Sequence, residues 1–142
     1  MPEPLWVLDT DSLTLWLRGH HRLATRVAHT PPLQLTTTII TVEEILRGWY
    51  TQVRRARDDD QLARAYQALQ DMVAFTQQVQ ILAFTRSAIA RYRDLRRQHR
   101  RTGVNDLRIA AIVLEFEGVL VTRNTADFVD IAGLRLEDWS QD

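Results

Sequence analysis

The stretch Leu5-Trp6-Val7-Leu8-Asp9-Thr10-Asp11 decides the fold. Four apolar residues in a short run are typical of a buried strand, and here they end in a carboxylate. In an open parallel sheet, the functional site lies outside the carboxyl ends of the strands. The polar residues that directly follow this strand are therefore candidates for a site.

Outward from this strand, apolar strand-like segments alternate with helical ones along the whole chain. We expect further strands at residues 33–40, 79–83, 119–122 and 134–136. Helices are expected at residues 10–17, 20–28, 41–55, 58–76, 87–101 and 106–117, with a short one near 126. This alternation predicts an α/β domain with a mainly parallel central sheet.

The composition fits one globular domain over residues 1–142 and excludes several kinds of chemistry. Of the 142 residues, 45% are hydrophobic and 25% are charged. Without cysteine, the chain has no disulfide, no zinc–thiolate site and no cysteine nucleophile. All 18 basic residues are arginine, so lysine Schiff bases and lysine-dependent phosphate loops are excluded too. The 18 acidic residues bring the net charge to zero, so only the distribution of charge can indicate a nucleic-acid surface.

The chain shows no feature of a membrane or secreted protein. No apolar run approaches the ~20 residues that a membrane span needs. The opening Met-Pro-Glu-Pro lacks the basic region of a signal peptide. We expect a soluble, cytoplasmic protein.

Acidic residues from distant parts of the chain are expected at one end of the sheet. Asp9 and Asp11 follow the first strand, and Glu43 and Glu44 open the helix after the second. Asp106 opens a later helix, and the fourth strand is followed by polar residues, namely Thr122, Asn124 and Asp127. Crowded carboxylates repel one another, and a hard divalent cation relieves the conflict. Such a site suits phosphodiester hydrolysis.

Each acid also has a purely structural alternative. Asp9 could cap the helix that follows it. Thr41 and Glu44 have the spacing of a capping box, which is the favoured interpretation of Glu44 taken alone. Asn105 is expected to cap the next helix, which would place Asp106 at the positive end of the helix dipole. The functional interpretation therefore depends on the joint placement of the acids.

Four motifs in order resemble those of the PIN-domain family. They are Leu8-Asp9-Thr10-Asp11, Glu44-Ile45-Leu46-Arg47-Gly48, Asn105-Asp106-Leu107-Arg108-Ile109-Ala110-Ala111 and Val121-Thr122-Arg123-Asn124-Thr125-Ala126-Asp127-Phe128. A single Asp-Thr-Asp carries no weight, but four motifs at fitting separations are fairly specific. The resemblance covers residues 5 to about 136, nearly the whole chain.

The resemblance implies a three-layer α/β/α sandwich and a metal-dependent endoribonuclease that uses Mg²⁺, which Mn²⁺ can replace. It carries over Asp9, Glu44 and Asp106 as metal-site acids, and the Glu44-to-Gly48 spacing favours Glu44 over Glu43. Asn124 stands where many PIN domains have aspartate, so we expect Asp127 to be the fourth acid. Thr10, Asp11, Thr122 and Asn124 are expected to assist. The amide at Asn124 puts a second metal ion in doubt.

Within the family, the chain looks most like VapC-type toxins of toxin–antitoxin pairs. That resemblance implies a homodimer and a partner antitoxin held by the helices between residues 41 and 76. The basic stretch 91–101 is expected to contact the RNA substrate through Arg93, Arg97, Arg100 and Arg101, with Tyr92 and His99 placed to stack on bases. Alternatively, this stretch is a solvated helix face or forms salt bridges with the Asp58–Asp60 run.

Two other functions stay open at this point. The first is a non-catalytic PIN-like module that binds RNA or protein, which Asn124 favours. The second is a phosphatase with Asp9 as nucleophile, because an Asp-x-Asp after the first strand also suits that chemistry. The absence of lysine counts against the phosphatase.

Overall fold

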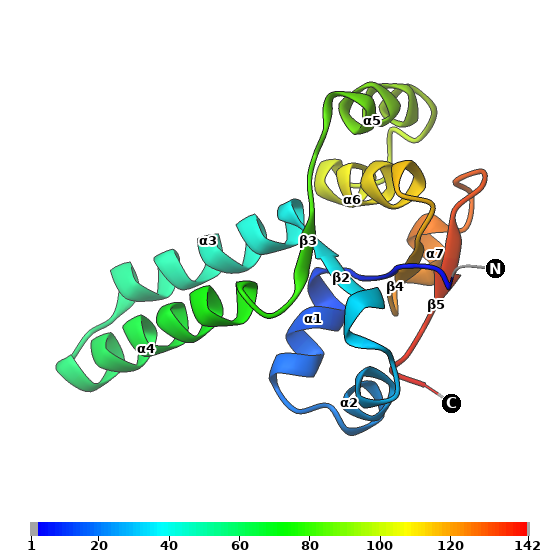
Figure 1. Ribbon diagram of the computed structural model, residues 1–142. Helices are drawn as coiled ribbons and strands as arrows, with labels where there is room; N and C mark the ends of the chain where they lie inside the picture. The colour runs from blue at the N-terminus through cyan, green and yellow to red at the C-terminus, as the bar shows by residue number, and fades with distance from the viewer. Residues whose placement is uncertain (1–2, 142) are drawn as a thin grey trace.

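The computed structural model describes residues 3–141, and its centre is a five-stranded, entirely parallel sheet (Figure 1). The strands are β1 (Trp6–Leu8), β2 (Leu35–Thr38), β3 (Gln80–Leu82), β4 (Val119–Val121) and β5 (Arg135–Glu137). Their order is β3-β2-β1-β4-β5, with β1 in the middle. The chain therefore moves outward from β1 on one side and later returns to its other side. This makes the carboxyl ends of β1 and β4 the switch point, where α/β proteins place their sites.

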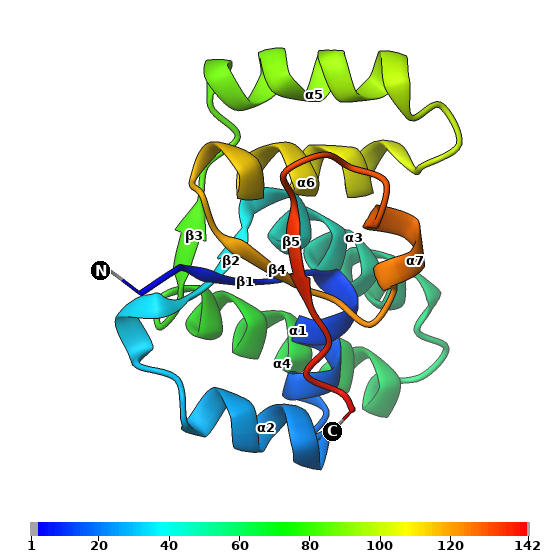
Figure 2. The same cartoon turned by 90° about the vertical axis from the view of Figure 1, so that its right-hand side faces the viewer.

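The connections between the strands are helical. The α-helices are α1 (Thr10–Leu17), α2 (His21–Ala28), α3 (Ile39–Arg55), α4 (Asp59–Thr76), α5 (Arg86–Gln98), α6 (Val104–Glu115) and α7 (Thr125–Phe128), and η1 (Pro32–Gln34) is a 3₁₀ helix. In Figure 2, α5 and α6 lie on one side of the sheet and α1 and α2 on the other. The expected three-layer α/β/α sandwich is confirmed, with a sheet that is fully rather than mainly parallel.

Alternate residues of the central strands face two separate cores. Val7 and Leu120 pack in the core formed with α5, α6 and α7. Leu8 and Val121 pack in the core formed with α1, α2 and α4. All four side chains are at most 1% exposed. The short strands are thus held by burial on both faces, as is usual for parallel sheets.

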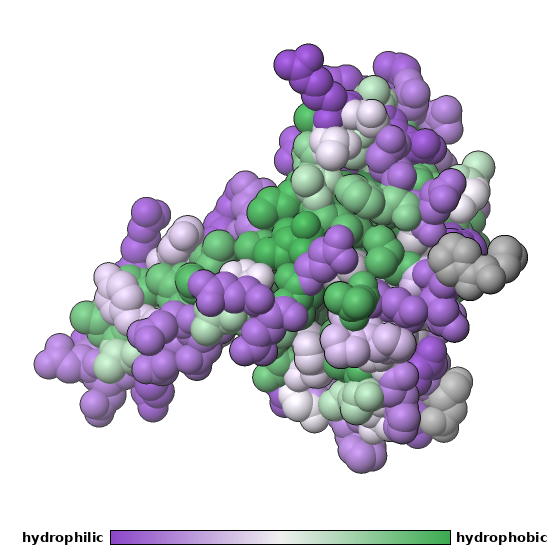
Figure 3. All heavy atoms as spheres, viewed as in Figure 1, coloured by the Kyte–Doolittle hydropathy of each residue, from purple (hydrophilic) through white to green (hydrophobic). Residues whose placement is uncertain are grey.

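Helices α3 and α4 pack against each other as a hairpin that projects from the body (Figure 1). Figure 3 shows hydrophobic and hydrophilic side chains intermixed along this projection, which we call the arm. Met72 is buried, as expected for core packing, whereas Tyr66 is 55% and Val73 is 50% exposed. Within residues 3–141, no helix has both the length and the apolar character to cross a membrane.

Two helix starts differ from the sequence prediction. Helix α3 begins at Ile39, and the side chain of Thr38, not of Thr41, caps it by accepting from Thr41 N at 3.1 Å. The predicted Thr41–Glu44 capping box is therefore wrong, which frees the Glu44 carboxylate for other contacts. Helix α6 begins at Val104 with Gly103 as N-cap, so the predicted cap at Asn105 is wrong as well.

Several element ends also differ from the prediction. Residues 33 and 34, predicted as the beginning of the strand, belong instead to η1, which opens with a proline, a residue favoured in the first turn of a helix. The strand then stops at Thr38, where α3 is capped. Helix α5 stops at Gln98, three residues before its predicted end, and leaves residues 99–103 as a loop.

Helix α6 ends at Glu115, two residues before its predicted end. Glu117 holds the left-handed conformation, with φ 55°, immediately before Gly118. Gly118 is needed for another reason: an added Cβ would lie 3.0 Å from both Leu5 O and Val7 Cγ2.

Opposite effects on stability are expected at these two neighbouring positions. Glu117→Gly removes the left-handed cost of an L-residue and should raise the free energy of unfolding by about 1 kcal/mol. Gly118→Ala should lower it by about 1–3 kcal/mol, because the new methyl group crowds β1. Urea unfolding of both variants measures the difference. Equal effects at the two positions would contradict this explanation of the turn.

Candidate active site

Asp9 is the most deeply buried acid at the carboxyl edge of the sheet. It follows β1, where its backbone N donates to Val121 O of β4 at 3.1 Å. Its carboxylate Oδ1 accepts from Ser12 N at 2.8 Å and so caps α1, as the structural alternative predicts. Burial raises the pKa of Asp9, although hydrogen bonds with Thr122 and Ser12 work in the opposite direction. Asp9 is only 5% exposed. It therefore caps α1 while its carboxylate lies in surroundings that disfavour the negative charge.

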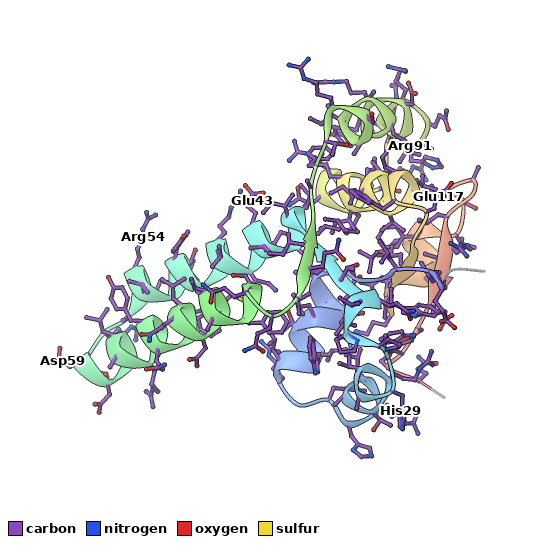
Figure 4. The ribbon with its side chains drawn as sticks, in the orientation of Figure 1. His29, Glu43, Arg54, Asp59, Arg91 and Glu117 are labelled. Atoms are coloured by element: carbon purple, nitrogen blue, oxygen red, sulfur yellow. The ribbon has the colours of Figure 1, made fainter. Side chains whose placement is uncertain are left out.

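Glu44 reaches the same edge from α3. Thr10 Oγ1 donates to Glu44 Oε1 at 2.9 Å and lies 3.2 Å from Thr41 Oγ1. Glu43 instead forms an exposed ion pair with Arg47 at 3.1 Å, on the outside of α3 (Figure 4). The contact with Thr10 links Glu44, but not Glu43, to the residue that follows Asp9.

The negative charges of the other three motif acids all act on Asp106. It stands in the first turn of α6. Its pKa is raised to about 6, first by burial and then by the negative charges of Glu44, Asp9 and Asp127. The structure therefore brings together the four acids that the sequence placed at one end of the sheet. The negative charges of Glu44, Asp9 and Asp127 repel the charge of Asp106.

The fourth motif presents an acid and an amide on the turn after β4. Thr122 is fully buried, and its Oγ1 accepts from Asn124 N at 3.0 Å. Asn124 is the N-cap residue of α7 but makes no capping bond with its side chain. Asp127 is exposed on α7 and contributes to the repulsion on Asp106. Asp127 rather than Asn124 thus supplies the fourth negative charge.

Sequence reasoning missed an ion pair across this edge. Arg123 Nε donates to Asp11 Oδ2 at 2.5 Å, and its NH2 group lies 3.5 Å from the other carboxylate oxygen. The two residues are 112 positions apart, so no local spacing indicates the pair. Asp11 is therefore neutralised by a partner, unlike the other acids of the site.

The donor set can be tested for its fit to a divalent ion. Among residues 3–141, no three Asp, Glu or His side chains are close enough together to bind one metal ion jointly. Magnesium does not require this, because it keeps several waters and is usually bound by one or two carboxylates together with substrate phosphates. The available ligands are all oxygens, and the pKa of Asp106 is raised by burial first and then by the negative charges of its three acidic neighbours. The residues therefore fit a hard, hydrated cation.

The predicted substrate arginines lie on α5 and the loop after it. Arg93, Arg97, Arg100 and Arg101 are all exposed. Helix α5 packs on α6, and the loop 99–103 leads directly into the turn that carries Asp106 (Figure 2). The alternative of salt bridges to residues 58–60 is wrong, because those residues begin α4 at the tip of the arm (Figure 4). The ion pairs of α5 are Arg91 with Glu115 and Arg97 with Asp94.

The repulsion predicts that removing one acid stabilises the metal-free protein. The pKa of Asp106 rises from 3.8 unfolded to about 6 folded, so its ionisation costs stability as pH rises through that window. Asp106→Asn should therefore raise the free energy of unfolding at pH 7 by about 1–2 kcal/mol, allowing for solvent screening. The gain should vanish at about pH 3, where the carboxyl is protonated in both states. Urea unfolding with chelator at both pH values measures it, with Asp130→Asn as an exposed control.

Comparison with known proteins finds relatives that match nearly the whole chain. No family model matches it. The ribonuclease VapC1 of Haemophilus influenzae strain R2866 is 27% identical over 143 residues, which cover 96% of this chain and 99% of that relative. The structure of VapBC-1 from nontypeable Haemophilus influenzae is similar with a TM-score of 0.73 and 25% identity, covering 96% of this chain and 99% of that chain. DNA-bound VapBC from Salmonella typhimurium has a TM-score of 0.77 at 20% identity, with the same coverage.

The parallel sheet, its strand order and the acidic carboxyl edge agree with the PIN-domain class that the four motifs resemble. The chain is similar to a ribonuclease VapC1 and to the VapBC-1 structure over nearly the full length of both chains. The resemblance inferred from the motifs is confirmed.

Proposed function

We propose that this protein is a metal-dependent endoribonuclease and the toxin of a toxin–antitoxin pair. The observation that carries the proposal is the raised pKa of Asp106, caused by burial and by three other carboxylates from separate parts of the chain. The full-length similarity to proteins named ribonuclease VapC1 supports RNA as the substrate. Residues 1–142 would form one domain that acts in the cytoplasm.

Asp9, Glu44, Asp106 and Asp127 would hold Mg²⁺, directly or through water, and Mn²⁺ would replace it. When bound, such an ion neutralises the carboxylates, polarises the phosphate and lowers the pKa of a water. The hydroxyl of Thr10 fixes the Glu44 carboxylate, and the side chain of Thr122 hydrogen-bonds to Asp9. Both contacts hold the two carboxylates in place before the substrate binds. Less conformational entropy of these side chains is therefore lost on binding.

Asn124 and the Arg123–Asp11 ion pair also lie at the carboxyl edge of the sheet. The Asn124 side chain is free of a capping bond, so its amide is available to a substrate oxygen. Arg123 holds Asp11 and brings one positive charge to the margin of an otherwise negative site. The exposed arginines Arg93, Arg97, Arg100 and Arg101 would contact RNA phosphates, whose binding would weaken with salt.

The partner would be an antitoxin, and the chain would form a homodimer. Structures of similar proteins include a toxin–antitoxin complex from Klebsiella pneumoniae and VapBC-1 from Haemophilus influenzae. A groove of about 650 Å³ runs beside the acids, between α1 and α3, and is lined in part by Leu17, Ile45 and Trp49. Its apolar walls next to Glu44 suit a protein segment that covers the site.

A cleavage assay on a panel of folded RNAs tests the proposed function. The purified chain is incubated with transfer RNA, ribosomal RNA fragments and messenger RNA, in Mg²⁺, in Mn²⁺ and with chelator. Discrete cuts that disappear with chelator are the expected result. Metal binding without cleavage of any RNA would favour a PIN-like binding module instead.

A further inference from the structure

The arginines of α5 form a continuous stripe along one face of the helix. Arg93, Arg96 and Arg97 follow the i, i+3, i+4 spacing that places side chains on one side of a helix, and Arg100 lies in the loop just after α5. Figure 3 shows many hydrophilic side chains at the top of the molecule, where α5 lies. Leu95 points the other way and is buried in the core with α6. The stripe is therefore the solvent-facing side of an otherwise anchored helix.

Three of these arginines enclose a hollow. Arg96, Arg97 and Arg100 alone line a cavity of about 320 Å³ at the carboxyl end of α5. Arg97 bonds to Asp94, but Arg96 and Arg100 have no hydrogen-bond or ion-pair partner in the described part of the chain. Concentrated positive charge without internal partners is expected to bind an anion.

The loop 99–103 connects the hollow to the acidic edge. An added Cβ on Gly103 would lie 3.7 Å from Asp106 Oδ2, so the loop ends beside the site. The six residue steps from Arg100 to Asp106 span at most about 20 Å. A nucleic-acid strand that crosses the acidic edge can therefore reach the hollow within a few nucleotides.

We propose that Arg96, Arg97 and Arg100 form a phosphate-binding subsite for the RNA strand, a few nucleotides from the cleaved bond. The proposal rests on the nuclease function proposed above. Guanidinium groups match phosphate oxygens in a bidentate manner. The Mg²⁺ proposed at the acidic edge would bind a phosphate there, and an RNA strand carries further phosphates at regular spacing that can reach the hollow. Arg96, which the sequence analysis did not include among the substrate arginines, is a member of this subsite, and Arg101 is not.

RNA binding without turnover tests the subsite. The probe is a fluorescein-labelled, unstructured 16-nucleotide uridine RNA, titrated with Asp106→Asn protein in Mg²⁺ at 50–200 mM NaCl. Into this background we place Arg96→Gln with Arg100→Gln. The matched control is Arg54→Gln with Arg55→Gln, which removes the same charge from the last turn of α3 on the arm (Figure 4). Thermal melting checks that both double variants stay folded.

The hollow variant should weaken binding about 10-fold at 100 mM NaCl and flatten the slope of log K against log salt by about 1.4, the value for two lost single-strand phosphate contacts. The arm variant should change neither by more than about twofold. Equal losses in both variants, or none in the hollow variant, would overturn the subsite. Displacement of the RNA by a polyglutamate peptide of equal charge would also overturn it, in favour of an acidic protein partner.

The proposed subsite and the proposed nuclease activity can each be rejected without rejecting the other. If the Arg96→Gln, Arg100→Gln chain with Asp106 intact cleaved RNA like the unmodified protein at low RNA concentration, the subsite would be rejected and the nuclease kept. If the hollow bound RNA as expected but the unmodified protein never cut it, the nuclease would be rejected and the subsite kept.

Discussion

Asp106→Asn is expected to lower the rate of RNA cleavage at least about 100-fold while leaving the protein folded. The substitution keeps the size of the side chain and removes one negative charge from the cluster. Asp106 accepts no capping bond, since Gly103 is the N-cap of α6. The predicted rise in stability at pH 7 would separate loss of chemistry from loss of structure.

Single-turnover cleavage of the most sensitive RNA measures this effect. Asp130→Asn is the matched control, because Asp130 is an exposed acid just beyond α7 and is absent from the charges that act on Asp106. The control should retain activity within about twofold. Full activity of Asp106→Asn in Mg²⁺ would remove Asp106 from the site.

Trp139→Ala is expected to lower the free energy of unfolding by about 3–5 kcal/mol. The side chain is 1% exposed and closes the core beneath β5. Its ring lies 5.5 Å from that of Trp6, and its Nε1 donates to Glu137 Oε1 at 3.0 Å. The loss is large compared with the ~5–15 kcal/mol that stabilises a typical domain.

Urea unfolding, with an unchanged dependence on denaturant, measures this loss. Trp49→Ala provides the comparison, because Trp49 is only partly buried and lines the groove beside Glu44. It should cost less than half as much stability. A loss below about 1 kcal/mol for Trp139→Ala would contradict the packing role assigned to that residue.

The acidic edge could be predicted from the sequence because parallel strands bring their carboxyl ends together. Once Leu5–Leu8 and Val119–Val121 are taken as buried strands, the acids that follow them must lie at one edge. The same reasoning explains why Glu44 and Asp106 could be placed there from the starts of α3 and α6. The raised pKa of Asp106, with contributions from the other three acids, agrees with that placement.

The first residues of the helices could not be predicted, because neighbouring residues were equally suitable as N-caps. Thr38 and Thr41 both have side chains that cap helices, and only the exit of the chain from β2 decides between them. The Arg123–Asp11 pair depends on tertiary structure alone. Arg96 is a different case, since its place beside Arg97 and its i, i+3 spacing from Arg93 were present in the sequence and could have been recognised.

Calorimetric titration of Mg²⁺ and Mn²⁺ into the metal-free protein tests the central claim most directly. Asp9→Asn is the decisive variant, because asparagine can still cap α1 through its side-chain oxygen while the charge is lost. The unmodified protein and Asp130→Asn should show a saturable site, and Asp9→Asn should lose it or bind at least about 10-fold more weakly. Equal binding by all three proteins, or no binding by any of them, would contradict a metal site at this edge.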